Sequence, residues 1–181
     1  YSYKLVDHLG IDYDVQDIET LVKESLALVN GANNSYDAKT NVGARIRTNQ
    51  IMVTAQTNNW LMANTCNRGE NCCGYASLWG DSVGSFSPLD MLTVEEVIEI
   101  GDDLDLPYEL THKVPIDGLQ PLTDEEKLGF TYKEVGDLIR YGTKGEHYDK
   151  IVEMYQKNKF KLEMIRLPHF NPNRYDYFLE H

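Results

Sequence analysis

Apolar residues recur at helical spacing in several stretches of the chain. In residues 18–29 they fall on one face of a helix, and Asp17 stands where an N-terminal cap is expected. The same spacing predicts further helices over residues 40–57, 93–104, 132–141 and 147–158. The pattern is therefore that of a chain rich in amphipathic helices.

Two of these predicted helices begin with the pattern of a capping box. Thr93 is followed by Glu96, and Thr131 by Glu134, at the spacing that lets the two side chains satisfy each other's backbone amides. Between these two helices, residues 110–128 are predicted to form a long loop, and loops of that length are usually functional or disordered.

Two short segments have the pattern of β-strands. Ile11, Tyr13 and Val15 alternate with acidic residues, and the apolar run at residues 60–65 suits a buried parallel strand. Strands that alternate with helices predict the α/β class. A doubly wound sheet usually has four or more strands, so we expect that the first strands of the fold are missing from this chain.

The charge of the chain changes which partners are expected. Its 181 residues, the size of one domain, include 29 acidic and 17 basic side chains, a net charge of −12. A nucleic-acid-binding protein normally has a basic face, so we expect no nucleic acid as a partner. No apolar run approaches the roughly 20 residues of a membrane span, so we expect no membrane either.

The cysteines and the absence of several common motifs argue against particular kinds of site. Cys66, Cys72 and Cys73 lack zinc-site spacing, and adjacent cysteines are poorly placed for a disulfide, which favours a reducing cytoplasm. The chain contains no phosphate loop of the Walker type, no dinucleotide fingerprint and no nucleophile elbow. Its scattered histidines argue against a hydrolase triad.

Polar side chains follow the predicted strand at residues 60–65. Ligands bind beyond the carboxyl ends of strands in open α/β sheets, and Thr65 and Glu70 stand in that position. A Thr hydroxyl can bond a base or a phosphate, and a Glu carboxylate can hold Mg²⁺ against phosphate oxygens. The alternative is a polar helix cap with solvated side chains.

Asn41, Arg45 and Arg47 form a second candidate cluster. Asn41 and Arg45 are four residues apart and share a helix face, whereas Arg47 is predicted to point elsewhere. Arginine suits bidentate contact with phosphate or carboxylate. The alternative is an ordinary surface salt bridge.

These segments occur in the order in which the NAD synthetases carry them. The motifs are Asn41-Val-Gly-Ala-Arg45-Ile-Arg47, Ala63-Asn-Thr65-Cys-Asn67-Arg-Gly-Glu70, Gly74-Tyr75, Gly80-Asp81-Ser82, Ser87-Pro88-Leu89, Leu92-Thr93-Val94-Glu95-Glu96-Val97, Lys113-Val-Pro115-Ile-Asp117-Gly118-Leu119, Thr123-Asp124-Glu125 and Leu128-Gly129-Phe130-Thr131-Tyr132. The match runs from about Leu9 to Tyr141, and a helix and tail follow at 142–181. The chain resembles the short, ammonia-dependent branch of that family, with residues 1–181 as one NAD synthetase domain.

The resemblance implies a fold and a reaction. The fold is the Rossmann-like, three-layer αβα type of the adenine-nucleotide α-hydrolases, and the protein is a homodimer. The enzyme is a ligase that uses ATP and Mg²⁺ to convert deamido-NAD (nicotinic acid adenine dinucleotide) and ammonia to NAD through an adenylylated intermediate. Such activation makes chemical sense, because a carboxylate is a poor electrophile and AMP is a good leaving group.

The resemblance also assigns binding residues by motif position. These are Asn41, Arg45, Asp117 and Lys161 for deamido-NAD, Thr65 for ATP and Glu70 for Mg²⁺. Asp124 and Glu125 lie on the loop that closes over the site in the family. No residue is assigned a catalytic role.

The chain departs from the family pattern in two respects. The family's Ser-Gly-Gly-x-Asp-Ser pyrophosphate loop is absent, so we expect it upstream of Tyr1 and expect the 181 residues alone to be inactive and marginally stable. Four substrate-binding positions, which are Lys, Asp, Lys and Thr in the commoner family form, are Leu78, Ser85, Val94 and Ile116 here.

Two other interpretations stay open. One is another ATP-pyrophosphatase amidotransferase, such as a GMP-synthetase-like enzyme, against which Ile116-Asp117-Gly118-Leu119 and Asp124-Glu125 argue. The other is an inactive homologue that acts as a dimerising or nucleotide-binding protein.

Overall fold

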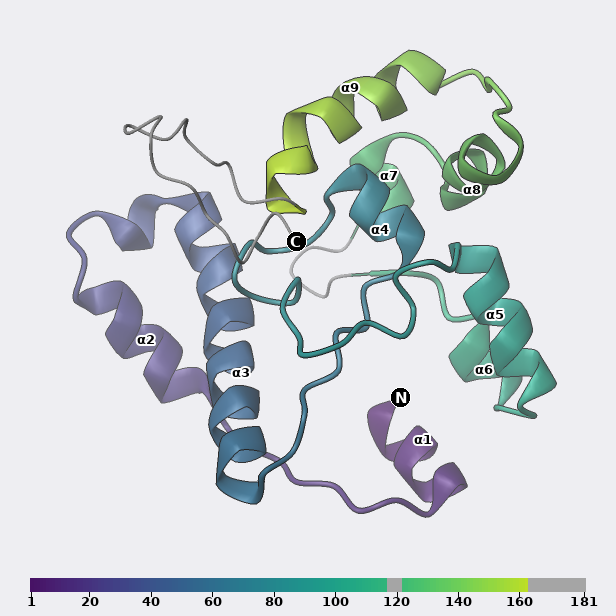
Figure 1. Cartoon of the computed structure of the whole chain (residues 1–181). Coiled ribbons are helices and arrows are strands. Elements are labelled where there is room, and N and C mark those ends of the chain that lie inside the picture. Colours follow the sequence, from purple (N-terminus) through teal and green to yellow (C-terminus); the bar gives the residue numbers. More distant parts are fainter. Residues whose placement is uncertain (117–121, 163–181) are drawn as a thin grey trace, which may run out of the picture.

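The computed structural model describes residues 1–116 and 122–162, which are mainly helical (Figure 1). The helices are α1 (Ser2–Leu9), α2 (Glu19–Ala27), α3 (Tyr36–Asn58), α4 (Arg68–Cys73), α5 (Val94–Asp103), α6 (Tyr108–Thr111), α7 (Asp124–Leu128), α8 (Tyr132–Tyr141) and α9 (Tyr148–Asn158), with short 3-10 helices η1 (Ala32–Asn34) and η2 (Lys159–Lys161). None of the described helices combines the length and the apolar character that crossing a membrane requires.

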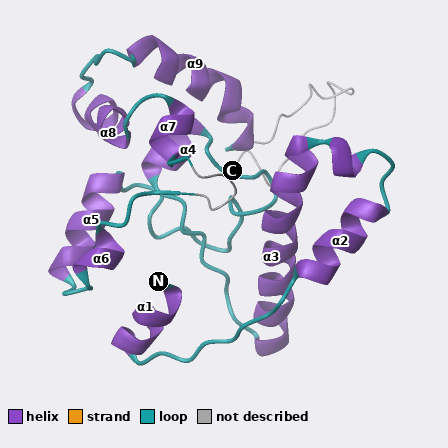
Figure 2. Cartoon of the chain, turned by 180° about the vertical axis from the view of Figure 1, so that it is seen from behind, coloured by secondary structure: helices purple, strands orange, loops and turns teal. Residues whose placement is uncertain are grey.

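Apart from α1 and α7, the helices lie in three groups around an irregular central segment (Figures 1 and 2). α2 packs on α3, and α5 packs on α6. The third group contains α4, α8 and α9, which contact one another, and α8 also contacts α5. The irregular segment between α3 and α5, interrupted by α4, runs through the middle of the molecule. α4 is thus the only regular element of that segment within the described residues.

The most buried side chains lie where α4, α8 and α9 meet. Cys73, Val135 and Ile151, one from each helix, are at most 2% exposed. Leu128, Phe130 and Tyr132 complete the same cluster. Complete burial of one such aliphatic side chain contributes about 1.5–3 kcal/mol, so this contact fixes α4 against the C-terminal helices.

The helices expected from the sequence are confirmed. The stretches 18–29, 40–57 and 147–158 correspond to α2, α3 and α9. Both predicted capping boxes are present, at the starts of α5 and α8. Two further capping boxes, which begin α4 and α7, were not predicted.

The two predicted strands and the predicted long loop are not found as expected. Residues 60–65 make a single parallel bridge, in which Asn64 donates to the Phe86 carbonyl at 2.8 Å, and residues 11–15 pair with no strand in the described ranges. A strand depends on a partner that is distant in sequence, so an alternating pattern alone does not create one. The stretch 110–128 contains the end of α6 and all of α7, because Thr123 caps α7.

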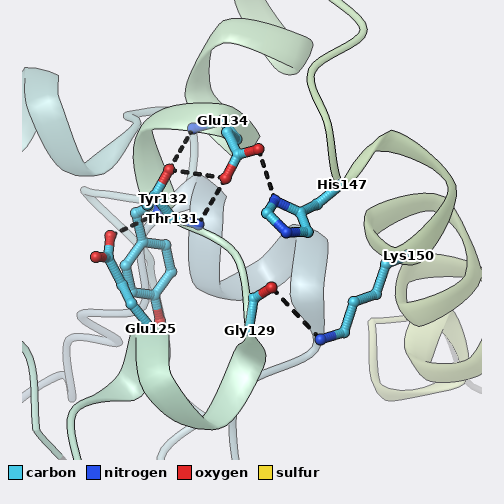
Figure 3. Close-up of polar contacts among 7 residues, drawn as sticks. All are labelled: Glu125, Gly129, Thr131, Tyr132, Glu134, His147 and Lys150. Carbon is cyan, nitrogen blue, oxygen red and sulfur yellow. Dashed lines mark hydrogen bonds and ion pairs between the residues drawn. The ribbon is translucent and has the colours of Figure 1, made fainter.

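Glu134 ties the start of α8 to the start of α9 (Figure 3). Its Oε2 accepts from the Thr131 amide at 3.0 Å, and its Oε1 lies 2.9 Å from Nδ1 of His147, the residue before α9. The hydrogen bonds from Thr131 and His147 lower the pKa of Glu134 to about 2. The ionised carboxylate is therefore the form that the folded chain favours.

The contact makes the stability of the fold depend on pH in the acid range. The folded-state pKa of Glu134 lies below the ordinary value of 4.5 for a glutamate. The stabilising effect of the ionised carboxylate is therefore complete above that value and is lost as the pH falls toward about 2. We expect Glu134→Gln, which keeps the capping geometry, to lower the free energy of unfolding at neutral pH by less than about 1 kcal/mol. Urea titrations at a series of pH values measure the difference.

Glu146→Gln is the matched control, because Glu146 is exposed in the connection between α8 and α9. It should unfold like the wild type at every pH. A Glu134→Gln difference that persists at the acid end would contradict the assigned pKa.

Candidate functional site

The candidate site is built around the short helix α4. At its start, the Asn67 side chain accepts from the Glu70 amide at 3.0 Å, and the Glu70 carboxylate accepts from the Asn67 amide at 2.9 Å. Asparagine is among the best N-cap residues, and Glu at the third helical position completes the box. The turn is therefore a polar helix cap, as one interpretation of the sequence held, but the Glu70 side chain is partly buried rather than solvated. The cap holds Glu70 in a fixed position.

A cavity of about 500 Å³ adjoins α4. Three of the residues predicted from the sequence, Asn41, Glu70 and Lys161, line it together. They come from α3, α4 and η2, which are far apart in the sequence. The other lining residues are Tyr36, Thr40, Ala44, Arg47, Gly74, Tyr75, Ala76, Ser77, Asp81, Ile116, Asp124 and Lys127.

Arg47, not Arg45, is the arginine of α3 that lines this cavity. Arg45 is exposed, and its Nε donates to the Leu78 carbonyl at 3.0 Å. The expectation that Arg47 points away from Asn41 is wrong, because the cavity is lined by a broad helix face that includes Thr40, Asn41, Ala44 and Arg47. The role of Arg45 in substrate binding stays a prediction.

Two other predicted residues are not among those that line the cavity. Thr65 is exposed and lies outside the lining set, so its contact with ATP stays a prediction. Asp117 lies outside the described residues. The cavity therefore gathers half of the six predicted positions, from three separate elements.

Glu70 carries a half-buried carboxylate in a negative environment. Burial raises its pKa, Asp124 and Asp81 raise it further, and the Asn67 amide opposes the shift. Within the part of the chain that the structure describes, Glu70 has no ion-pair partner. A bound cation would relieve both the burial cost and the repulsion.

The donor set fits a magnesium ion that is shared with phosphate. The described residues hold no group of three or more His, Cys, Asp or Glu side chains placed to bind a metal by themselves. Mg²⁺ usually takes one or two protein carboxylates and completes its shell with water and substrate phosphate oxygens. Glu70 provides such a carboxylate at the edge of a cavity that is large enough for a ligand.

Lys161 and Asn158 fix the other end of α4. The Lys161 ammonium donates to the carbonyls of Gly74 at 2.7 Å and Ala76 at 3.1 Å, and the Asn158 amide donates to the Cys73 carbonyl at 3.0 Å. Burial lowers the pKa of Lys161. These bonds satisfy carbonyls at the C-terminal end of α4, where a helix leaves them without intrahelical partners.

Gly74 allows this close approach. It has a φ of +61° as the cap residue after α4, and a Cβ built there would lie 2.3 Å from the Asn158 Cβ. Sequence reasoning missed Asn158, because a single amide at the end of a helix carries no signal of a partner in a distant turn. The Gly74-Tyr75 motif was the one sign in the sequence that another part of the chain approaches the backbone at this turn.

Comparison with known proteins identifies the family of the chain. The sequence pattern of the family described as NAD synthase matches residues 1–166. The chain belongs to the NAD synthase family. An NH(3)-dependent NAD(+) synthetase of Thermococcus sibiricus is 34% identical over 74% of this chain and 52% of its own length, and one of Archaeoglobus fulgidus is 30% identical over 90% and 68%.

Solved structures of the NAD synthase family and its relatives show the same fold. An NMN synthetase of Francisella tularensis superposes with a TM-score of 0.85 at 28% identity, over 93% of this chain and 71% of that one. An NH3-dependent NAD synthetase of Campylobacter jejuni gives 0.70 at 23%, over 92% and 70%. The predicted α/β class of the adenine-nucleotide α-hydrolase type is thus confirmed, although the described residues contain only the single bridge. The chain spans about half to 70% of the length of these relatives.

A substitution of Lys161 tests whether its hydrogen bonds hold η2 against the turn that follows α4. Lys161→Met keeps the length of the side chain but leaves the Gly74 and Ala76 carbonyls without their donor. We expect a loss of roughly 1–3 kcal/mol in the free energy of unfolding. Hydrogen exchange at the amides that follow Gly74 should accelerate as well.

Lys157→Met is the control, because Lys157 is exposed one turn earlier on α9. It should leave stability and exchange unchanged. Equal stability and equal hydrogen exchange in the two variants would show that the Lys161 bonds do not hold η2 against the turn after α4.

Proposed function

We propose that the natural protein catalyses the ATP-dependent amidation of deamido-NAD by ammonia, with Mg²⁺ as the metal ion. Membership of the NAD synthase family supports this, and so do relatives that are named NH(3)-dependent NAD(+) synthetases. The single observation that carries the proposal is the cavity that joins Asn41, Glu70 and Lys161.

The charges of the cavity suit the proposed ligands. Arg47, Lys127 and Lys161 line the cavity and could meet the phosphate and carboxylate groups of a dinucleotide. The carboxylates of Glu70, Asp81 and Asp124 line it as well, so an anionic ligand there also calls for a metal ion. Glu70 would hold Mg²⁺, which supplies stabilisation of the negative charge that develops on phosphate oxygens. Asn41 and Lys161 would contact deamido-NAD, together with Arg45 and Asp117, and Thr65 would contact ATP.

The proposed chemistry has two steps. A carboxylate oxygen of deamido-NAD forms a bond to the α-phosphorus of ATP, and the bond from that phosphorus to pyrophosphate breaks. Ammonia then forms a bond to the activated carbonyl carbon and loses a proton, and AMP leaves with the former carboxylate oxygen. The residues of this chain bind and orient the two substrates, and that positioning lowers the barrier to attack.

We also propose a homodimer in the cytoplasm. Exposed apolar side chains at the end of α2 and along α3, including Leu28, Ile51 and Val53, are available for an interface. The three cysteines are free, as a reducing compartment allows. Sedimentation of the natural protein tests the dimer.

Nicotinate mononucleotide is a second candidate substrate. The Francisella tularensis structure, which superposes better than the Campylobacter jejuni one, is named an NMN synthetase. Leu78 and Val94 also stand where the commoner family form has lysines. A mononucleotide carries fewer phosphates than a dinucleotide and needs fewer cations to bind it.

The deciding experiment is an activity assay on the natural full-length protein. It supplies ATP, Mg²⁺, ammonium and either acid, and follows the amide product together with AMP. We expect Glu70→Gln to lower kcat/KM by about 100-fold or more, because a metal ion contributes several kcal/mol to charge stabilisation. The ratio of the two kcat/KM values identifies the natural acid.

The stability of Glu70→Gln serves as the control for folding. The pKa of Glu70 is raised in the folded chain, so the ionised side chain destabilises the ligand-free fold once the pH exceeds the ordinary carboxyl range. The amide variant should therefore melt no lower than the wild type at neutral pH. A folded variant with full activity would exclude the metal role, and no product from either acid would exclude the amidation.

A further inference from the structure

Tyr132 has a hydroxyl group that the ligand-free fold does not use. Its side chain is 4% exposed and belongs to the buried cluster between α4, α8 and α9. Its ring lies beside α4, since a Cβ built on Gly69 would be 3.1 Å from Cδ1 of Tyr132. Among the buried side-chain nitrogen and oxygen atoms of the described residues, only the Tyr132 hydroxyl has no hydrogen-bond partner.

The missing partner has an energetic consequence. A buried hydroxyl without a hydrogen bond is unfavourable, and native proteins rarely keep one without a ligand, an ion or a water to satisfy it. Phenylalanine would fill the same space without this cost. The rest of Tyr132 is satisfied, because its amide donates to Glu125 at 2.8 Å (Figure 3).

The surroundings of the hydroxyl indicate which partner it would take. Burial raises the pKa of Tyr132, and the carboxylates of Glu70 and Asp124 raise it further, so the phenol keeps its proton and can donate. Glu70 lies next to Gly69, against which the ring packs, and its carboxylate uses Oε2 for the Asn67 amide. A carboxylate accepts several hydrogen bonds, so Glu70 has capacity for a second donor.

We propose that Tyr132 is a positioning residue for the divalent cation that Glu70 holds: its hydroxyl donates to the Glu70 carboxylate in the cation-bound state. The inference rests on the proposed function, which assigns Mg²⁺ to Glu70. Carboxylates that bind metals are themselves oriented by hydrogen bonds from outer residues, and loss of such a partner typically lowers metal affinity by about 10–100-fold. Asn67 provides one such bond through its amide, and Tyr132 provides the other.

The proposal predicts opposite effects of one substitution. In the cation-free natural protein, Tyr132→Phe removes an unsatisfied polar atom, so we expect the Tm to rise by roughly 2–4 °C. The same variant should bind Mn²⁺, a paramagnetic substitute for Mg²⁺, about 10–100-fold more weakly. Calorimetric unfolding measures the first effect, and electron paramagnetic resonance of free Mn²⁺ measures the second. A merely structural tyrosine would not give this opposition.

Tyr155→Phe is the control, because Tyr155 is 39% exposed on α9. It should change neither the Tm nor the Mn²⁺ affinity. Wild-type Mn²⁺ affinity in Tyr132→Phe, or a lowered Tm without cation, would overturn the proposal.

Glu70→Gln separates this proposal from the proposed function. If that variant loses Mn²⁺ binding while Tyr132→Phe binds normally, the metal role of Glu70 stands and the role of Tyr132 is overturned. If Glu70→Gln still binds Mn²⁺ with wild-type affinity, the metal assignment fails and the inference on Tyr132 fails with it. The activity assay tests the amidation itself, separately from these two Mn²⁺-binding measurements.

Discussion

Asn67 and Glu70 exchange hydrogen bonds at the start of α4, and the cavity depends on that exchange. The pair satisfies backbone amides that every helix leaves unpaired at its start, and so it makes a six-residue helix possible within an irregular segment. The same bonds set the position of a half-buried carboxylate. One local requirement of helix formation therefore also places the group that is best suited to hold a cation.

The cost of that arrangement falls on the ligand-free fold. The Glu70 carboxylate is half-buried near two other carboxylates, and the Tyr132 hydroxyl is buried without a partner. Polar groups of this kind usually oppose folding. The apolar contacts of Cys73, Val135 and Ile151, in the same cluster as the Tyr132 ring, offset the cost, because they hold α4 whether or not a ligand is bound.

The parts of the fold that were predictable depend on short stretches of sequence. Thr93 and Thr131 cap helices with glutamates three residues later, and α2, α3 and α9 follow from apolar periodicity. The strands were not predictable, because residues 60–65 form only one isolated bridge, to Phe86, and strand pairing depends on residues that are distant in the sequence.

The site was predictable to the extent that motif order identifies positions. Asn41, Glu70 and Lys161 do meet, but the contacts of Lys161 with backbone carbonyls leave no trace in the sequence. The sequence alone could not tell which arginine of α3, Arg45 or Arg47, lines the cavity, because that depends on which face of α3 the cavity adjoins. The unsatisfied hydroxyl of Tyr132 could not be predicted either, since the sequence does not distinguish this tyrosine from any other core residue.

The bonds between α4 and the end of α9 join residues that are 85 to 87 positions apart. A ribosome makes the chain from its N-terminus, so the turn after α4 emerges long before Asn158 and Lys161 do. Until then the carbonyls of Cys73, Gly74 and Ala76 are bonded to water, and Gly74 has no neighbour that fixes its conformation. This side of the cavity consequently takes its final form only after Asn158 and Lys161 have left the ribosome.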